Sequence, residues 1–191
     1  MQTDCRLPNR HSASRLAIAM PEHNPDLWAP WRSEYIRSLG DQPADQSCFL
    51  CDYGASPQAD AENFVLCRSK VAFAVLNRYP YTNGHLLIAP NRHVGDLAAL
   101  SDDELNTLSR MIRDSISILT KVVNAHGFNV GLNINRCAGA GLPGHVHWHV
   151  VPRWEGDTNF MTTVGSARII SESLEKVYHR YQEVAKEATP S

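Results

Sequence analysis

Short stretches of continuous or alternating hydrophobic residues run through the middle of the chain. They predict four strands, over residues 64–67, 71–76, 85–90 and 128–135, since a period of two residues places one face of a strand in a core. Turn-forming residues, among them Asn83-Gly84, separate the second strand from the third. The predicted strands come mainly in adjacent pairs rather than alternating with helices. This order favours an antiparallel sheet with helices packed on it, the α+β class.

Two longer segments have the period of an α-helix instead. Ser101 followed by Asp102-Asp103-Glu104 has the pattern of a capping box and predicts a helix from there to about Asn124. One face of that helix carries aliphatic residues, namely Leu105, Leu108, Ile112, Ile116 and Leu119. Gly127 is the expected stop signal, and residues 169–188 predict the second main helix.

Composition indicates how the chain is organised. Residues 1–25 are polar, contain proline and lack periodicity, so we expect a flexible N-terminal tail there and a single domain over residues 26–191. A short packing helix is expected within residues 27–36. No apolar run approaches the roughly 20 residues that cross a bilayer, and the N-terminus lacks the apolar block of a secretory signal. We therefore expect a cytoplasmic protein with no membrane partner.

Net charge limits the classes of binding partner, and the cysteine content indicates whether disulfides are expected. The formal net charge is −2, which argues against nucleic acid as a partner because non-specific binding to it needs many contacts from lysine and arginine to phosphate. The five cysteines are an odd number spread over the chain, which is a poor disulfide framework. Only Cys48 and Cys51 form a motif, a Cys-x-x-Cys pair.

Residues 144–151, GHVHWHVV, carry three histidines at alternate positions. On a strand, His145, His147 and His149 would form one row, with Val146, Trp148 and Val150 behind it in the core. Three uses compete: a three-histidine metal site with an open position, nucleophilic and acid–base catalysis, and a surface row without a role. Arg153, which follows, fits a phosphate contact and a surface ion pair equally well.

The Cys-x-x-Cys pair bears on this choice. A closed structural zinc site needs four nitrogen or sulfur ligands, and Cys48 and Cys51 supply two of them. His93, at the end of a predicted strand, and one member of the histidine row are the best candidates for the other two. If one histidine of the row binds zinc, two remain for chemistry.

These motifs resemble those of the histidine triad (HIT) family of nucleotide hydrolases and transferases. GHVHWHVV matches the triad pattern, and residues 77–90, NRYPYTNGHLLIAP, resemble the family segment that runs from an asparagine to Gly-His. The likeness covers about residues 45 to 160, and its flanks look most like the branch of diadenosine tetraphosphate phosphorylases and fragile-histidine-triad-type hydrolases. It implies a HIT-like fold whose sheet extends across a homodimer.

The resemblance also implies catalytic roles. In the family the middle histidine attacks the α-phosphorus of a nucleotide and forms a covalent nucleotidyl-histidine, which makes His147 the expected nucleophile. Neutral imidazole suits that step because it keeps a nitrogen lone pair at pH 7. His149 and His85 would flank the phosphate and stabilise or protonate groups around it.

Nucleotide-binding residues follow from the same likeness. Asn77 resembles the asparagine that contacts ribose in the family. Asn133 lies near the family's polar residue that faces the leaving group, with Asn135 as its rival. The glycine-rich bend that contains Gly139 and Gly141 can offer backbone N–H groups to phosphate, and it equally fits a tight turn between strands.

By analogy with galactose-1-phosphate uridylyltransferases and other triad proteins that carry two cysteines, Cys48, Cys51, His93 and His145 would close a structural zinc site. No organic cofactor is expected. Many family members have Gly-Gln-Ser or Gly-Gln-Thr ahead of the triad, whereas this chain has Gly141-Leu142-Pro143-Gly144. We expect cleavage of dinucleoside polyphosphates by phosphate or by water. The alternatives are a zinc-stabilised nucleotide-binding module with little turnover and a three-histidine metalloenzyme.

Overall fold

The structure, a computed structural model, describes residues 48–157 and 170–188. All of them belong to one compact unit of the chain. The expected tail at residues 1–25 and the expected helix within residues 27–36 lie outside the described residues.

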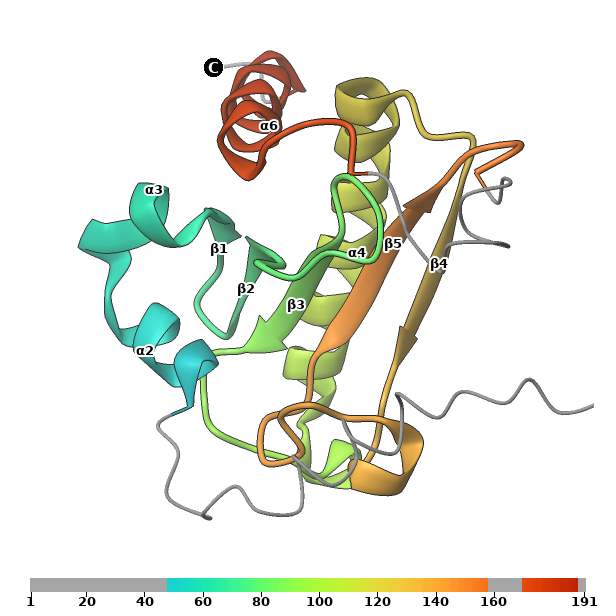
Figure 1. Cartoon of the computed structure of the whole chain (residues 1–191). Helices are drawn as coiled ribbons and strands as arrows, with labels where there is room; N and C mark the ends of the chain where they lie inside the picture. Colours follow the sequence, from blue (N-terminus) through green and yellow to red (C-terminus); the bar gives the residue numbers. More distant parts are fainter. Residues whose placement is uncertain (1–47, 158–169, 189–191) are drawn as a thin grey trace, which may run out of the picture. The chain divides into compact units, whose positions relative to one another are not determined.

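The centre of this unit is a five-stranded sheet in which every neighbouring pair of strands is antiparallel. The strands lie in the order β1-β2-β3-β5-β4 (Figure 1). Their bounds are Val65–Arg68 for β1, Ala72–Leu76 for β2, Leu86–Pro90 for β3, Gly127–Leu132 for β4 and Trp148–Arg153 for β5. The chain therefore crosses from β3 to β4 at the edge and returns with β5 between them, so that the histidine motif lies beside β3.

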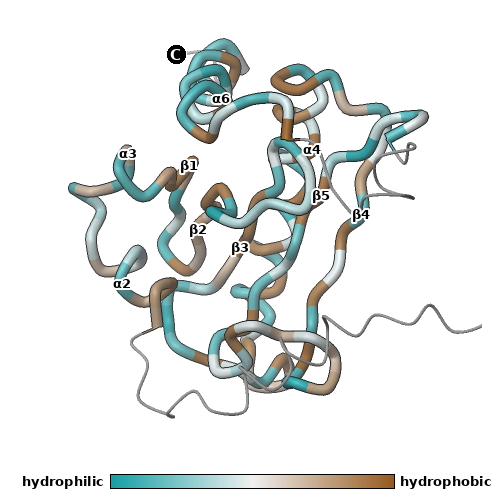
Figure 2. Tube along the Cα trace, viewed as in Figure 1, coloured by the Kyte–Doolittle hydropathy of each residue, from teal (hydrophilic) through white to brown (hydrophobic). Residues whose placement is uncertain are grey.

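Two helices cover one face of the sheet, as expected for the α+β class. These are α4, Asp102–Val123, and α6, Leu174–Ala188. Leu108, Leu119 and Val177 from the two helices pack against one face of the strands, and hydrophobic residues recur at intervals along both helices (Figure 2). The described part of the chain has no helix that is long and apolar enough to cross a membrane.

The start of α4 is the predicted capping box. The Ser101 side chain accepts a hydrogen bond from the Glu104 backbone, and the Glu104 side chain accepts one from the Ser101 backbone. The helix ends before the expected stop at Gly127: it stops at Val123, and Asn124 adopts a left-handed conformation with φ 49°. Asparagine is one of the few non-glycine residues that tolerates this conformation, so it ends the helix.

The opposite face of the sheet has a smaller core under α2, Phe49–Ala55. Leu50 of this helix packs with Phe73 and Val75 of β2 and with Leu87 of β3. The 3₁₀ turn η1, Pro57–Ala59, and the short helix α3, Asp60–Asn63, connect α2 to β1. None of these elements was predicted, because the segment is too short to have a clear period.

Two predicted strand boundaries are wrong, and both errors lie beside the histidines. The strand expected over residues 128–135 ends at Leu132, since Asn135 has φ 66° and begins the 3₁₀ turn η3, Arg136–Ala138. The histidine strand begins only at Trp148. The Val146 backbone N–H donates to the carbonyl of Val94 at 2.7 Å, so this part of the chain pairs with the loop after β3. That loop also contains the 3₁₀ turn η2, Leu97–Ala99.

Candidate active site and metal cluster

His85, which is buried, and His149, which is half-buried, form a pair at the centre of the sheet. His149 lies on β5 directly opposite Leu87 of β3, and His85 immediately precedes β3 and is fully buried. Nε2 of His85 lies 3.0 Å from Nδ1 of His149. The antiparallel pairing of β3 with β5 therefore brings together two histidines that are 64 residues apart in the chain.

The surrounding donors fix which nitrogen of each ring carries the proton. Nδ1 of His85 faces the backbone N–H of Tyr81 at 3.1 Å and the side-chain amide of Asn77 at 3.3 Å. The oxygen of that amide accepts from the Tyr79 N–H at 2.9 Å, so its nitrogen faces His85. Nδ1 of His85 is therefore an acceptor and Nε2 a donor to His149. A neutral His149 then carries its own proton on Nε2.

His147 has the opposite arrangement. Its Nδ1 lies 2.8 Å from the backbone carbonyl of His145, and because a carbonyl only accepts, Nδ1 carries the proton. Nε2 keeps its lone pair. The His147 ring lies 5.1 Å from the ring of His149, centroid to centroid.

Burial keeps these imidazoles neutral. Desolvation, followed by the neighbouring histidines, lowers the pKa of His85 to about 3, and desolvation followed by His147 lowers the pKa of His149 to about 4. Desolvation also lowers the pKa of His147, against a hydrogen bond to the His145 carbonyl that raises it. An uncharged His147 is the form that has a lone pair at neutral pH.

Tyr81 is a part of the site that sequence reasoning missed. Its ring stacks on His85 with centroids 4.7 Å apart and lies nearly parallel to His149 at 5.9 Å. Tyr81 lies in the loop between β2 and β3, and its position four residues before His85 has no periodic signature. Only the folded loop shows that it covers the histidine pair.

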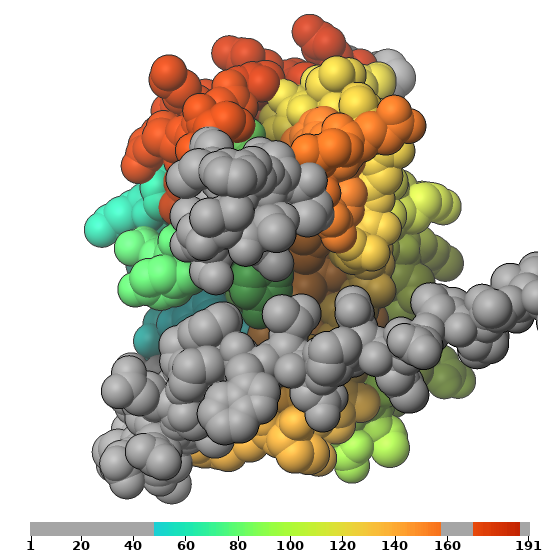
Figure 3. Space-filling model, turned by 45° about the vertical axis from the view of Figure 1, so that its right-hand side comes forward, coloured from blue at the N-terminus to red at the C-terminus, as the bar shows by residue number. Residues whose placement is uncertain are grey.

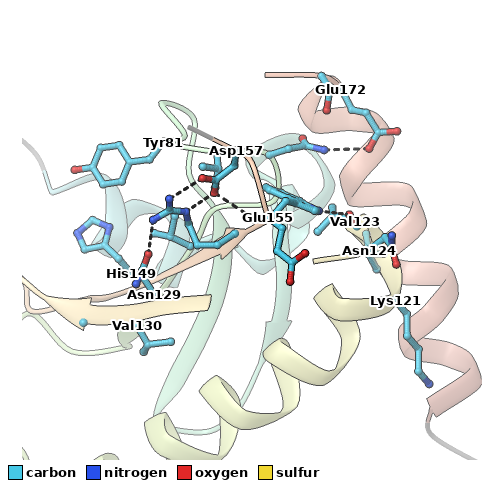
Figure 4. Close-up of a pocket in the computed structure, with 18 of the residues that line it drawn as sticks. Tyr81, Lys121, Val123, Asn124, Asn129, Val130, His149, Glu155, Asp157 and Glu172 are labelled. Atoms are coloured by element: carbon cyan, nitrogen blue, oxygen red, sulfur yellow. Dashed lines mark hydrogen bonds and ion pairs between the residues drawn. The ribbon is translucent and has the colours of Figure 1, made fainter. Parts of the chain in front are cut away.

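Two cavities flank the histidines. The larger, about 1120 Å³, is the trough: its floor is the face of β4 and β5 that carries Asn129, Gly131, His149, Val151 and Arg153. Figure 4 shows Tyr81 and His149 at one end of the trough and Lys121 and Glu172 at the other. Asn133 lines the trough and its rival Asn135 does not.

The smaller cavity, about 240 Å³, lies on the Asn77 side of the site. Phe49 and Tyr53, one helical turn apart on α2, form one wall, with their rings 5.5 Å apart. Leu76 and Leu87 from the sheet form part of the rest. Sequence reasoning missed this cavity, although the four-residue spacing of the two aromatics is the signal that an amphipathic helix would have given.

The predicted phosphate-binding glycines lie in the loop before the histidines. Gly139 has φ 89° and ends η3, and Gly141 lies in the exposed bend that follows. Leu142, in the bend ahead of the histidines, packs against the core under α2.

The four predicted metal ligands form one cluster. One ligand atom from each of Cys48, Cys51, His93 and His145 lies within 4.8 Å of the other three. Sγ of Cys51 is 3.2 Å from Nδ1 of His93, and Sγ of Cys48 is 3.2 Å from Nδ1 of His145. A tetrahedral zinc ion at about 2.3 Å from sulfur and about 2.0 Å from nitrogen needs neighbouring ligands roughly 3.5 Å apart. The donor set and its spacing fit zinc.

The histidine ligand His145 is also oriented as a zinc site requires. Nε2 of His145 lies 2.9 Å from the carbonyl of Pro90, to which it donates, so Nδ1 keeps its lone pair for the cluster. Burial, followed by a hydrogen bond to Cys48 and repulsion from it, raises the pKa of Cys51 to about 11. A divalent cation would offset this repulsion between two thiolates.

Comparison with known proteins identifies the family. Residues 58–156 match the family described as HIT domain. A Mycobacterium tuberculosis protein named AP-4-A phosphorylase is 40% identical over 151 residues, which cover 78% of this chain and 77% of that protein. The chain belongs to the HIT domain family. The resemblance seen in the sequence is thereby confirmed.

Further relatives of this HIT-domain chain support the same assignment. A Schizosaccharomyces pombe protein named bis(5'-nucleosyl)-tetraphosphatase (asymmetrical) is 36% identical over 93 residues, 49% of this chain and 50% of that protein. A Zn-bound histidine triad family protein from Mycobacterium smegmatis has a similar structure, with a TM-score of 0.61, 22% identity, and coverage of 74% of this chain and 95% of that chain. This similarity confirms the HIT-like α+β fold.

Proposed function

We propose that this HIT-family enzyme cleaves dinucleoside polyphosphates such as diadenosine tetraphosphate, with His147 as the nucleophile. The observation that carries the proposal is the hydrogen bond from Nδ1 of His147 to the His145 carbonyl, which leaves a lone pair on Nε2 of a neutral imidazole. The named activities of the Mycobacterium tuberculosis and Schizosaccharomyces pombe relatives support this substrate class.

The first step exchanges one bond for another. Nε2 of His147 attacks the α-phosphorus, a P–N bond forms, and the P–O bond to the rest of the substrate breaks. With diadenosine tetraphosphate, the enzyme keeps AMP on His147 and ATP leaves with the electron pair of the broken bond. Nε2–H of His149 faces the negative charge that develops on the phosphate oxygens, and His85 holds His149 in the tautomer that presents this proton.

The nucleoside side of the substrate fits the smaller cavity. Its walls carry the aromatic rings of Phe49 and Tyr53, which suit stacking on a base. Asn77, which lines the same cavity and hydrogen-bonds to His85, is the proposed contact to ribose. Gly139 and Gly141 remain proposed phosphate contacts, and Asn133 the proposed polar contact on the side of the leaving group.

The second step regenerates the enzyme. An oxygen of inorganic phosphate attacks the same phosphorus, the P–N bond breaks, and ADP leaves with His147 neutral again. Water in place of phosphate would give AMP. We favour phosphate because the Mycobacterium tuberculosis relative, whose match covers 78% of this chain, is named a phosphorylase. Hydrolysis is the second candidate, on the basis of the Schizosaccharomyces pombe relative.

We further propose that Cys48, Cys51, His93 and His145 hold a structural zinc ion and that no organic cofactor takes part. Zinc bound there would cross-link α2 to the two loops that carry His93 and His145. The nucleophile depends on this cluster, because the His145 backbone holds the proton of His147.

The proposed cellular form is a cytoplasmic homodimer. The cysteines that the structure describes are free thiols, as in a reducing compartment. Strand β4 is at the end of the described sheet order, and its Val130 is 43% exposed, so a second copy can extend the sheet there. Light scattering should give the mass of two chains, and Val130→Lys should shift it toward one; a wild-type mass of one chain would contradict the dimer.

The function is tested by chromatography of the products from diadenosine tetraphosphate, with and without added phosphate. We expect ADP plus ATP with phosphate and loss of both when His147 is changed to Ala, by at least roughly 1000-fold. Wild-type enzyme quenched with denaturant at alkaline pH, where the P–N bond survives, should carry AMP on one histidine in a mass spectrum.

His179→Ala is the control, since His179 is an exposed histidine on α6; it should keep wild-type turnover. AMP plus ATP without phosphate would identify a hydrolase. If the wild type gives no product and His147→Ala still binds nucleotide, the protein is a nucleotide-binding module rather than an enzyme. Turnover that persists in His147→Ala but stops on metal removal would favour the metalloenzyme.

A further inference from the structure

The trough continues from the reacting histidines along one face of β5. His149, Val151 and Arg153 are alternate residues of this strand and all line the trough. At about 3.3 Å per residue, Arg153 lies roughly 13 Å along the strand from His149. The residue opposite His149 on β4 is Gly131, where a Cβ atom would meet nothing within 4 Å, so the floor is open beside the histidine.

The Arg153 guanidinium is held in place by only some of its N–H groups. Its Nε and one terminal nitrogen donate to the Asp157 carboxylate at 2.5 and 2.7 Å, and the other terminal nitrogen donates to the Asn129 amide oxygen at 2.8 Å. A guanidinium has five N–H groups, so one on each terminal nitrogen is left among the described contacts. The side chain remains 43% exposed.

Other contacts fix the walls of the trough. Trp154 Nε1 donates to the Val123 carbonyl at the end of α4 at 3.1 Å, and Arg180 of α6 donates to the Val122 carbonyl at 2.6 Å. Residues around the end of β5 lie against the α4–β4 segment in the space-filling view (Figure 3). Pre-formed walls of this kind lower the entropic cost of binding a long, flexible ligand.

The direction of the substrate follows from the two cavities. A nucleoside in the smaller cavity reaches the α-phosphorus from the Asn77 side. The leaving oxygen must depart roughly opposite Nε2 of His147, and His149 stands at the entrance of the trough. The part of the substrate beyond the α-phosphate therefore extends into the trough. The volume of the trough, about 1120 Å³, is large enough for a nucleotide.

We propose that the trough binds the leaving half of the substrate, a nucleoside polyphosphate, and that Arg153 contacts its distal phosphates. This assignment rests on the proposed function. The trough is not uniformly basic: Lys121, Arg153 and Arg180 are accompanied by Glu155, Asp157 and Glu172. Two of these acids hold the two arginines, so the anion is recognised by directed N–H groups rather than by net charge.

The test compares two substrates that share the first half and differ in the second. Diadenosine tetraphosphate has a long polyphosphate leaving group, and the p-nitrophenyl ester of AMP has one without phosphate. Arg153→Met should lower kcat/KM for diadenosine tetraphosphate roughly 10- to 100-fold, the effect of losing a charge-assisted hydrogen bond, and change that for the ester less than about 3-fold. Arg153→Lys should recover part of the loss.

The matched control is Arg113→Met, which removes an arginine that is 73% exposed and paired with Asp114 on α4. It should leave kcat/KM unchanged for both substrates. Equal losses for both substrates in Arg153→Met would mean that Arg153 supports the fold of the active site, and unchanged values would mean that it contacts no phosphate; either result overturns the assignment.

A binding measurement separates this assignment from the proposed function. Inorganic tripolyphosphate is titrated into the wild type, Arg153→Met and Arg113→Met by calorimetry. Weaker binding in Arg153→Met alone supports an anion site in the trough even if the wild type turns over neither substrate. Absence of binding to the wild type, or equal binding by all three proteins, overturns it.

Discussion

At the scale of single residues, the site depends on histidines that stay neutral because they are buried. His85 is fully buried, and its neighbours supply donors to Nδ1 and an acceptor to Nε2. A protonated His85 would lose the acceptor that Tyr81 N–H requires. The same burial that sets the tautomers therefore makes the folded protein sensitive to acid.

We predict that the free energy of unfolding falls as the pH is lowered from 7 to 5. The pKa of His85 drops from 6.5 to about 3 and that of His149 to about 4 on folding, so between pH 6.5 and 4 the unfolded chain binds more protons and stability decreases with falling pH. The slope approaches about 1.4 kcal/mol per pH unit for each histidine at the lower end. Urea titrations at several pH values measure it.

The matched pair of variants for this prediction is His85→Gln and His179→Gln. The first should flatten the pH dependence, since it removes the histidine whose pKa falls to about 3 on folding, and the second should leave the slope as in the wild type. Parallel curves for all three proteins would show that the acid sensitivity has another origin.

At the scale of elements, the loop after β3 and the loop before β5 are in direct contact. A Cβ atom on Gly95 would lie 2.6 Å from the carbonyl oxygen of Pro143, and one on Gly144 would lie 3.2 Å from Nε2 of His93. The two loops carry one histidine ligand each. Their close approach, which only glycine permits here, sets the distance between His93 and His145.

Gly95→Ala should therefore destabilise the fold and loosen the metal cluster. A contact of that length with backbone atoms forces the loops apart, at a cost of about 1 to 3 kcal/mol. Urea unfolding gives the stability, and the zinc-to-protein ratio after desalting gives the metal retention.

Gly127→Ala is the comparison variant, because a Cβ atom at the start of β4 would meet nothing within 4 Å. Its free energy of unfolding should stay within about 0.5 kcal/mol of that of the wild type, and its zinc-to-protein ratio should be unchanged. If Gly95→Ala behaves the same way, the loops have room that the structure does not indicate.

At the scale of the whole described unit, the cluster joins α2 on one face of the sheet to the loops that position the triad. Leu50 and Cys51 are neighbours in α2: the first enters the core and the second enters the cluster. The candidate metal ligands and the hydrophobic core thus share the same helix. That helix also forms a wall of the smaller cavity. Loss of a bound metal should therefore disturb the proposed nucleotide site as well.

Removal of zinc with a chelator should lower the melting temperature by at least about 5 °C and abolish turnover, because a ligand that binds only the folded state contributes its binding free energy to stability. Cys48→Ser should reproduce both effects. Differential scanning calorimetry and metal analysis of the same samples measure them.

Cys137→Ser is the control, as this exposed cysteine of η3 lies outside the cluster. It should melt like the wild type. A metal-free wild-type preparation with full activity and an unchanged melting temperature would exclude a structural role for zinc.

The sequence by itself determined the elements whose signal is local. Periodicity predicted the sheet and α4, and the capping box at Ser101 predicted where α4 begins, because these depend on residues within one or two turns. The spacing of the histidines and cysteines, together with the family resemblance, named the four residues that form the cluster. Donor type and number are properties of the chain itself.

The tertiary structure decided what depends on residues far apart in the chain. Only the pairing of β3 with β5 joins His85 to His149, and only their neighbours determine which ring nitrogens carry protons. Because Val146 pairs with Val94, β5 begins at Trp148 rather than at the first histidine. The stacking of Tyr81 on His85 and the trough both depend on how the loops fold. Local patterns do not encode these contacts, because a hydrogen bond or a cavity wall is set by whichever segment the fold brings beside it.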